Sequence, residues 1–370
     1  MRDRVKFVNK DQTRFYTVLK GRVEDYFRQN GISAHANGTM VFKTIFMLAL
    51  YFVPYALILS GTANIWVMWI AAAIMGFGLA GIGMSVMHDA NHGAYSSSPA
   101  MNKFIGYVLN LVGADSSNWK IQHNILHHTY TNIYGHDEDI NNKVGARFSP
   151  HGRHKSFQRF QVVYVFFLYS LMTAYWVLLK DFLQYFGYAK RGIDGETKRS
   201  RVKKLVVMLC WKTFYIFYMF VLPMLLLDIA FWQVLVGFLT LHVVGGLVLS
   251  VVFQLAHVVE GTSHPAPDEN NNIENEWAIH QLQTTADFSR NNRLITFYVG
   301  GLNFQTEHHL FPKVCHVHYP KIAPIVKQTA EEFGIPYLYY PSLREAFASH
   351  IRMLKKLGRN DILHLLNEMG

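Results

Sequence analysis

The sequence predicts an all-α integral membrane protein, with four transmembrane helices in two hairpins and a cytoplasmic helical cap. Three observations predict this fold class. Only 16% of the 370 residues are charged, whereas a soluble domain of this size carries about a quarter. Four apolar runs are long enough to cross a bilayer, which takes roughly 20 residues. The links inside the two hairpins hold no Lys or Arg. We expect residues 1–370 to form one domain.

The four apolar runs cover about residues 42–60, 65–87, 205–227 and 231–256. The third run is the least uniform, because it contains Lys212. Their links, 61–64 and 228–230, are so short that consecutive helices must run antiparallel. Near the end of the chain, residues 342–357 place apolar side chains at helical spacing with Lys and Arg between them, which predicts an amphipathic helix.

Two further apolar segments are not expected to cross the membrane. Residues 104–113 are too few to cross a bilayer. Residues 162–179 are long enough, but a single additional crossing there would put the histidines before and after it on opposite sides of the membrane. We therefore expect both segments to lie in the membrane interface or against the helix bundle.

The positions of Lys and Arg set the expected orientation. They fall in the first 43 residues, in the loop between the second and third spans and in the part after the fourth span; Lys212 is the exception, inside the third span. Positive residues favour the cytoplasmic side, so we expect both termini and the long loop to be cytoplasmic. The net charge of +10 then suits anionic lipid headgroups. We find no basic module for nucleic acid, and we expect no signal peptide.

Histidine is the anomaly of the composition, and its clusters have a spacing. The first box, His88-Asp-Ala-Asn-His92, begins where the second span ends, and positions i and i+4 share a helix face. One such pair is a weak signal. The second box, His123-Asn-Ile-Leu-His127-His128, repeats the spacing, and its last histidine lies about 100° further round, where it can reach a second metal ion.

The third box is Gln305-Thr-Glu-His308-His309, whose polar residues at i, i+3 and i+4 share one face. Its amide oxygen is a possible ligand, weaker than imidazole. A lone histidine, His257, directly follows the fourth span, and an ionisable residue at a membrane exit is a functional candidate. Eight histidines thus gather on one predicted side: His88, His92, His123, His127, His128, His257, His308 and His309.

These side chains indicate a metal centre. Any single histidine could be a half-buried structural group, but three paired clusters on one side of a membrane are hard to obtain by chance. Imidazole suits iron better than Mg²⁺ or Ca²⁺, which prefer oxygen. A structural zinc ion needs only four ligands, so eight histidines predict two metal ions. Four further residues are candidates for a ligand or for a supporting contact: Gln305, His316, Asp89 and Asn91.

The three boxes, their order and their placement against four spans resemble the membrane fatty acid desaturase family, and the resemblance covers nearly the whole chain. It implies two iron ions held by the eight histidines, with Gln305 in or near the ligand sphere. It also implies removal of two hydrogens from a long acyl chain, carried by a lipid or by CoA, with O₂ and two electrons. Gln at the start of the third box is similar to the front-end members, which insert a double bond between an existing one and the carboxyl end.

Some family members carry a fused cytochrome b5 domain with the sequence His-Pro-Gly-Gly. This chain has no such sequence, so we expect the electron donor to be a separate protein of the ferredoxin or cytochrome b5 type. The acyl carrier, the chain length and the position of the double bond stay open.

Two other functions compete with desaturation. Related di-iron lipid hydroxylases share the same boxes, and the sequence does not separate them from desaturases. A metal transporter would also place histidines near membrane helices. Transport needs polar groups through the membrane, however, and the four spans offer only Lys212, His242 and a few hydroxyl groups.

Overall fold

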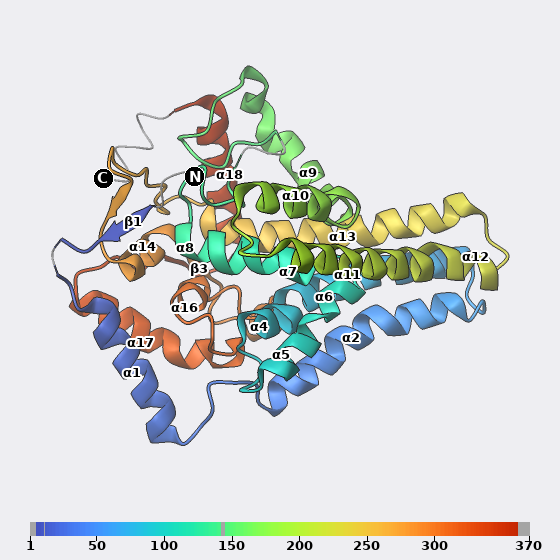
Figure 1. The fold of residues 1–370 in the computed structure, drawn as a ribbon, viewed down its shortest axis with the longest axis horizontal. Coiled ribbons are helices and arrows are strands. Elements are labelled where there is room, and N and C mark those ends of the chain that lie inside the picture. The colour runs from blue at the N-terminus through green and yellow to red at the C-terminus, as the bar shows by residue number, and fades with distance from the viewer. Residues whose placement is uncertain (1–4, 11, 142–144, 362–370) are drawn as a thin grey trace. The chain divides into compact units, whose positions relative to one another are not determined.

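The computed structural model describes residues 5–10, 12–141 and 145–361, and the chain is mainly helical (Figure 1). It divides into two compact units, each built from segments that are separate in sequence. The first unit comprises Met1–Ala36, Gln122–Val165 and Val252–Gly370, and the second comprises Asn37–Ile121 and Phe166–Val251. The expectation of one domain over residues 1–370 stays a prediction.

The second unit holds most of the long apolar helices. Its elements are α2 (Gly38–Leu59), α3 (Ile65–Gly81), η1 (Ile82–Val86), α4 (Met87–His92), α5 (Pro99–Gly106), α6 (Val108–Leu111), α7 (Ser116–Lys120), η4 (Trp176–Lys180), α10 (Asp181–Arg191), α11 (Lys198–Ile216), η5 (Phe217–Val221) and α12 (Leu222–Leu226). Two helices, α9 (Gln161–Tyr175) and α13 (Phe231–His257), have residues in both units.

The first hairpin of this unit is formed by α2 and α3. Asparagine side chains cap both helices: Asn37 accepts the amide N–H of Met40, and Asn64 accepts those of Trp66 and Val67. The two helices approach closely at Gly78, where a Cβ atom would lie 2.7 Å from the backbone nitrogen of Tyr51. A larger residue at Gly78 would therefore force the hairpin apart.

Lys212, the charged residue of the third apolar run, is buried on α11 with a partner that the sequence did not suggest. Its Nζ lies 2.5 Å from Oδ2 of Asp181, and it donates hydrogen bonds to the carbonyl oxygens of Gly113 and Val177 at 2.7 and 2.8 Å. These contacts give the ammonium group a full set of acceptors, which is the condition for burying it.

The first unit carries a helical core and two short parallel strand pairs. Its elements are β1 (Lys6–Val8), α1 (Phe15–Asn30), η2 (Ile121–His127), α8 (His128–Tyr130), η3 (Ser156–Phe160), β2 (Asn272–Glu274), α14 (Trp277–Thr284), β3 (Asp287–Phe288), α15 (Arg293–Tyr298), α16 (Gln305–Leu310), η6 (His316–His318), α17 (Tyr319–Glu332), β4 (Tyr339–Tyr340) and α18 (Leu343–Arg359). Strand β1 pairs with β2, and β3 pairs with β4.

The core of the first unit lies between α1, α14, α16 and α17. Phe15 and Leu19 of α1 pack with Leu282 of α14 and with Ile322 and Val326 of α17. The third histidine box is on α16, so this core supports it directly. Helix α18 confirms the amphipathic helix predicted for residues 342–357; its buried face includes Met353, Leu354 and Leu357.

Five helices of the described chain are long and apolar enough to cross a membrane: Gly38–Leu59, Ile65–His92, Ser156–Arg191, Lys198–Leu226 and Phe231–His257. The expected count of four is therefore not confirmed. The extra candidate contains the segment 162–179, which continues without a break into α10 and is thus longer than the apolar run suggested. The chain is a multi-pass membrane protein, and the four expected spans match four of these helices closely.

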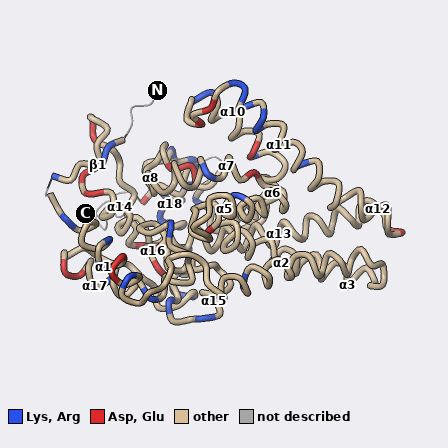
Figure 2. The backbone as a smooth tube through the Cα atoms, turned by 60° about the horizontal axis from the view of Figure 1, so that its bottom comes forward, with Lys and Arg blue, Asp and Glu red and all other residues tan. Residues whose placement is uncertain are grey.

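The charged residues are unevenly distributed along these helices. Figure 2 shows no Lys or Arg where α3 and α12 reach the hairpin links, whereas α10 and the start of α11 carry several. The same helices expose many large apolar side chains, among them Trp66, Phe77, Leu225 and Trp232. Such a surface is suited to lipid rather than to water.

Candidate metal centre

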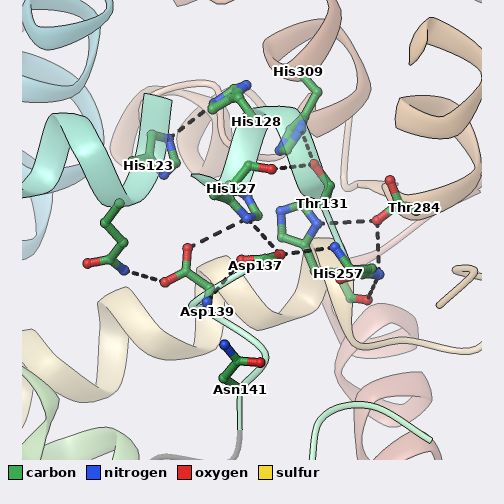
Figure 3. Close-up of polar contacts among 12 residues, drawn as sticks. His123, His127, His128, Thr131, Asp137, Asp139, Asn141, His257, Thr284 and His309 are labelled. Carbon is green, nitrogen blue, oxygen red and sulfur yellow. Dashed lines mark hydrogen bonds and ion pairs between the residues drawn. The ribbon is translucent and has the colours of Figure 1, made fainter. Parts of the chain in front are cut away.

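Six of the eight predicted ligand histidines lie together in the first unit, and Figure 3 shows five of them. They come from four elements, η2, α8, α13 and α16, which stand far apart in the sequence. They are His123, His127, His128, His257, His308 and His309, and all six are buried.

The second box does not have the winding that its spacing suggested. Residues Ile121–His127 form a π-helical segment, which holds more residues per turn than an α-helix. The rings of His123 and His127 stack with centroids 5.2 Å apart, as expected for a shared face. The π winding also brings His128 round to His123, so that their Nε2 atoms are 3.2 Å apart. The expectation that His128 can reach a second metal ion stays a prediction.

Three imidazoles form a first group. Nε2 of His128 lies 3.2 Å from Nε2 of His123 and 3.0 Å from Nε2 of His308. Imidazole nitrogens that bind one transition-metal ion at about 2.1 Å lie roughly 3 to 3.4 Å apart. Nε2 of His128 thus has the separation from both neighbours that is usual for ligands to a single ion.

Three other imidazoles form a second group beside the first. Ring nitrogens of His127, His257 and His309 lie within 4.8 Å of one another. The groups are adjacent, because the rings of His128 and His309 stack with centroids 4.3 Å apart. Gln305 belongs to the second group, since its side-chain amide is 2.9 Å from Nε2 of His257. These clusters could hold metal ions, and the predicted number of two ions stays a prediction.

Four of the six imidazoles use their Nδ1 atom for a hydrogen bond to the protein. His127 donates to Oδ2 of Asp137 at 3.1 Å, and His309 donates to Oε1 of Gln281 at 2.8 Å. His257 meets the carbonyl oxygen of Thr284 at 3.3 Å, and His308 meets the hydroxyl of Tyr319 at 3.2 Å. A proton on Nδ1 leaves the lone pair on Nε2, which is the form that binds a metal.

These residues fit a pair of transition-metal ions. Among the described residues, Nε2 of His127 has no hydrogen-bond partner although it is buried, and the same holds for Oε1 of Gln305. A buried polar atom without a partner is costly, and a metal ion would satisfy both atoms. The donor set is rich in imidazole, which favours iron, copper or zinc over Mg²⁺ or Ca²⁺.

The first box lies in the second unit, on α4. The rings of His88 and His92 are 4.8 Å apart, as the i, i+4 spacing predicted, and both contact Trp119. Asp89 and Asn91 are buried on the same helix, and the amide of Asn91 contacts the carbonyl oxygen of Gly106 at 3.5 Å. The roles of these four residues as ligands or supports stay predictions.

The last candidate, His316, is buried on η6 and packs against Gly301. At Gly301, φ is +70° and a Cβ atom would lie 2.7 Å from Cβ of His316, so this approach requires glycine. A supporting role for His316 also stays a prediction. His242, the histidine inside the fourth span, lies in the second unit, where its Nε2 is 2.9 Å from the hydroxyl of Tyr215.

Carboxyl groups lie behind the ligand histidines. Burial alone would lower the pKa of His127, but the charge of Asp137 and its hydrogen bond outweigh burial, so the pKa of His127 is raised above its ordinary value. On α16, burial raises the pKa of Glu307 well above its usual range. Asp287 of β3, also with a raised pKa, accepts the amide N–H of Thr306 at 3.0 Å and so caps α16. Tyr337 contacts both carboxyl groups.

Sequence reasoning missed the residues that hold the Nδ1 atoms. Asp137 stands in the loop after the second box, Gln281 on α14 and Tyr319 at the start of α17. None of them repeats a spacing, and each is an ordinary residue for its element. Only the fold brings them to the imidazoles, apart from a weak signal in the three acidic residues of the sequence Asp137-Glu-Asp139.

Comparisons with known proteins agree with this geometry. The model of the family described as fatty acid desaturase matches residues 63–341. The sn-1 linoleoyl-lipid 6-desaturase of Synechocystis sp. is 37% identical over 96% of this chain and 98% of its own length. The sn-1 linoleoyl-lipid 6-desaturase of Arthrospira platensis is 36% identical over 94% of this chain and 93% of its own length. The acyl-lipid (8-3)-desaturase of Physcomitrium patens is 36% identical over 96% of this chain and 74% of its own length.

Replacing Asp137 with Asn tests the orientation of the second group. The amide keeps the shape but removes the negative charge that favours the Nδ1 proton of His127. We expect the affinity for a divalent transition metal to fall by about 10-fold to 100-fold, which is usual when the partner of a ligand histidine is lost. The measurement is the metal bound per purified chain at fixed free metal. The control is Asp268→Asn, in an exposed loop, and equal binding by both variants would contradict the assigned role.

Proposed function

The chain belongs to the fatty acid desaturase family, and we propose that it uses its histidines to hold two iron ions beside an acyl chain drawn from the bilayer. It is an oxidoreductase that desaturates fatty acyl chains. The family membership rests on the matched residues 63–341 and on relatives that share more than a third of their residues with this chain.

The observation that carries the metal proposal is the convergence of six buried imidazoles, four of which already engage Nδ1 in a hydrogen bond to the protein. We propose that His123, His128 and His308 bind one iron ion and that His127, His257 and His309 bind the other. His88 and His92 complete the ligand set, with Gln305 in or beside it. When bound, the ions activate O₂ and so supply the oxidising power that removes two hydrogens from neighbouring methylene groups.

The protein's own contribution is to orient these ligands and to exclude water. The oxygens of Asp137 and Gln281 accept the Nδ1 protons of His127 and His309, and the hydroxyl of Tyr319 holds the ring of His308 through Nδ1. All six imidazoles are buried, so water has little access to them. A site held in this way before the substrate arrives needs little reorganisation during the reaction.

The substrate proposed is the acyl chain of a membrane lipid. The relatives named above are lipid desaturases by name, and Gln305 begins the third box as in front-end enzymes. The expected spans offer few polar groups along an acyl chain. The position of the new double bond must then be set by the distance between the headgroup and the metal centre. We propose front-end regiochemistry, between an existing double bond and the carboxyl end.

We propose that the two electrons come from a separate carrier protein of the ferredoxin or cytochrome b5 type. Hydroxylation is not favoured, because the relatives described above are named as desaturases. Transport is not favoured either, because the imidazoles gather in one buried cluster of the first unit rather than along a path.

We propose that the termini and the histidines face the cytoplasm. The support is the distribution of Lys and Arg, which avoid the links at 61–64 and 228–230. The fifth candidate helix, Ser156–Arg191, then lies along the interface or inserts without crossing, since a single additional crossing would separate the second box from the third.

Labelling of single cysteines in intact cells tests this orientation. With Cys210 and Cys315 replaced by Ser and Ala, we expect an impermeant maleimide to react with Thr62→Cys and Asp228→Cys and not with Asn141→Cys. Asn141→Cys should react only after the membrane is opened. Reaction from outside at Asn141→Cys would mean that Ser156–Arg191 crosses the membrane.

Lipid analysis of a host that expresses the chain and is fed defined unsaturated fatty acids tests the reaction itself. We expect a new alkene on the carboxyl side of an existing double bond, found in membrane lipids. An alcohol at the same position would identify a hydroxylase. A new double bond on the methyl side would contradict the front-end assignment.

His257→Ala tests a ligand that no box contains. We expect the parent chain to hold close to two iron ions, and the variant to lose iron and to retain less than about one hundredth of the desaturation. The control is His151→Ala, an exposed histidine whose Nε2 contacts the carbonyl oxygen of His264 at 2.7 Å. Near-normal product formation by His257→Ala would mean that His257 is structural. The missing metal ligand would then have to be Gln305, His316 or the buried His280 of α14.

A further inference from the structure

Asn132, four residues after the second box, is fully buried and makes an unusual set of contacts in the first unit. Its side-chain amide nitrogen lies 3.0 Å from the carbonyl oxygen of His257, 3.1 Å from that of Ser263 and 3.3 Å from that of Thr284. Carbonyl oxygens accept hydrogen bonds, so the donor NH₂ end of the Asn132 amide must face them and the acceptor oxygen must face away. This fixes the orientation of the side chain.

Two of these contacts concern His257 directly. One acceptor is the carbonyl oxygen of His257 itself. Another is the carbonyl oxygen of Thr284, which also accepts the Nδ1 proton of the His257 ring at 3.3 Å. Asn132 therefore touches both the backbone of this histidine and the group that orients its imidazole.

The backbone of Asn132 reaches a second histidine. Its amide N–H donates to Oδ2 of Asp137 at 2.9 Å, and the same oxygen accepts the Nδ1 proton of His127. This contact depends on a φ of +59°, in the left-handed region that asparagine tolerates better than most residues. One residue thus connects the supports of His127 and His257, which reach the site from different parts of the chain.

We propose that Asn132 is a positioning residue that sets the spacing of His127 and His257 for a metal ion. The inference rests on the proposed metal role of these two histidines. Thr131, the preceding residue, contributes in the same direction, because its hydroxyl lies 2.8 Å from Oε1 of Gln281, the group that holds His309. The groups that orient all three histidines of the second group therefore contact two consecutive residues, Thr131 and Asn132.

A purely structural role would have a different signature. Buried hydrogen bonds stabilise the fold whether or not a metal is bound, so their loss would lower the stability of the metal-free chain and leave metal affinity unchanged. A positioning role lowers metal affinity, and part of the lost activity returns when the free metal concentration is raised.

The test uses Asn132→Gly in the full chain purified in detergent. Glycine adopts a φ of +59° freely, so the change removes the amide contacts without straining the backbone. The matched control is Asn271→Gly, which also has a left-handed φ, +58°, in a loop away from the six histidines. After chelation, each protein is dialysed anaerobically against defined Fe²⁺ concentrations, and bound iron, melting temperature and desaturation are measured.

We expect Asn132→Gly to need about 10-fold to 100-fold more Fe²⁺ for half-saturation than the control, and excess Fe²⁺ to restore part of its desaturation. His257→Ala should show no such rescue. Equal half-saturation in Asn132→Gly and Asn271→Gly overturns the inference, even if Asn132→Gly melts at a lower temperature. A parent chain that binds no iron overturns the proposed function instead.

If Asn132→Gly yields too little folded chain, Asn132→Asp takes its place. Aspartate keeps the shape and the left-handed preference but has no N–H to donate to the three carbonyl oxygens. The same shift in half-saturation supports the inference, and iron binding equal to that of the control overturns it.

Discussion

The structure of the first unit depends on one constraint: six imidazoles are buried within contact of one another, and each must present a lone pair rather than a proton to the space they share. A buried imidazole that met its neighbours with a proton would repel a cation and leave polar atoms unsatisfied. The protein meets this constraint by engaging the opposite ring nitrogen. Asp137, Gln281, Tyr319 and the carbonyl oxygen of Thr284 each take an Nδ1 atom.

This constraint accounts for several irregular features of the backbone. The second box winds as a π-helix, which lets His123 stack on His127 while its Nε2 meets that of His128. Helix α16 is only six residues long and has no side-chain cap at Phe304, so Asp287 from β3 caps it instead. Regular helices would have been more stable locally, but they would not have brought the ring nitrogens of four elements to one place.

The sequence predicted the parts of the site that repeat a spacing and failed where a contact depends on the fold. The three boxes, His257 and the four apolar spans follow from helical periodicity and hydrophobicity, and the helices formed close to the expected bounds. The carboxylates and amides that contact the histidines show no regular spacing in the sequence. Asp137 and Gln281 are 144 residues apart, and they contact the rings of His127 and His309. Asp181, the partner of Lys212, escaped prediction for the same reason. The segment 162–179 was judged by its apolar length alone, and the polar residues that extend its helix to Arg191 were not counted.

The placement of the carboxylates explains how a buried site can be both imidazole-rich and electrostatically tolerable. Oδ2 of Asp137 lies on the far side of the His127 ring from Nε2, so its negative charge strengthens the histidine as a donor without occupying a ligand position. Glu307 and Asp287 both contact the hydroxyl of Tyr337, and burial raises the pKa of both carboxyl groups. Asp137 thus supports His127 from the ring nitrogen opposite to the one that would bind a metal ion.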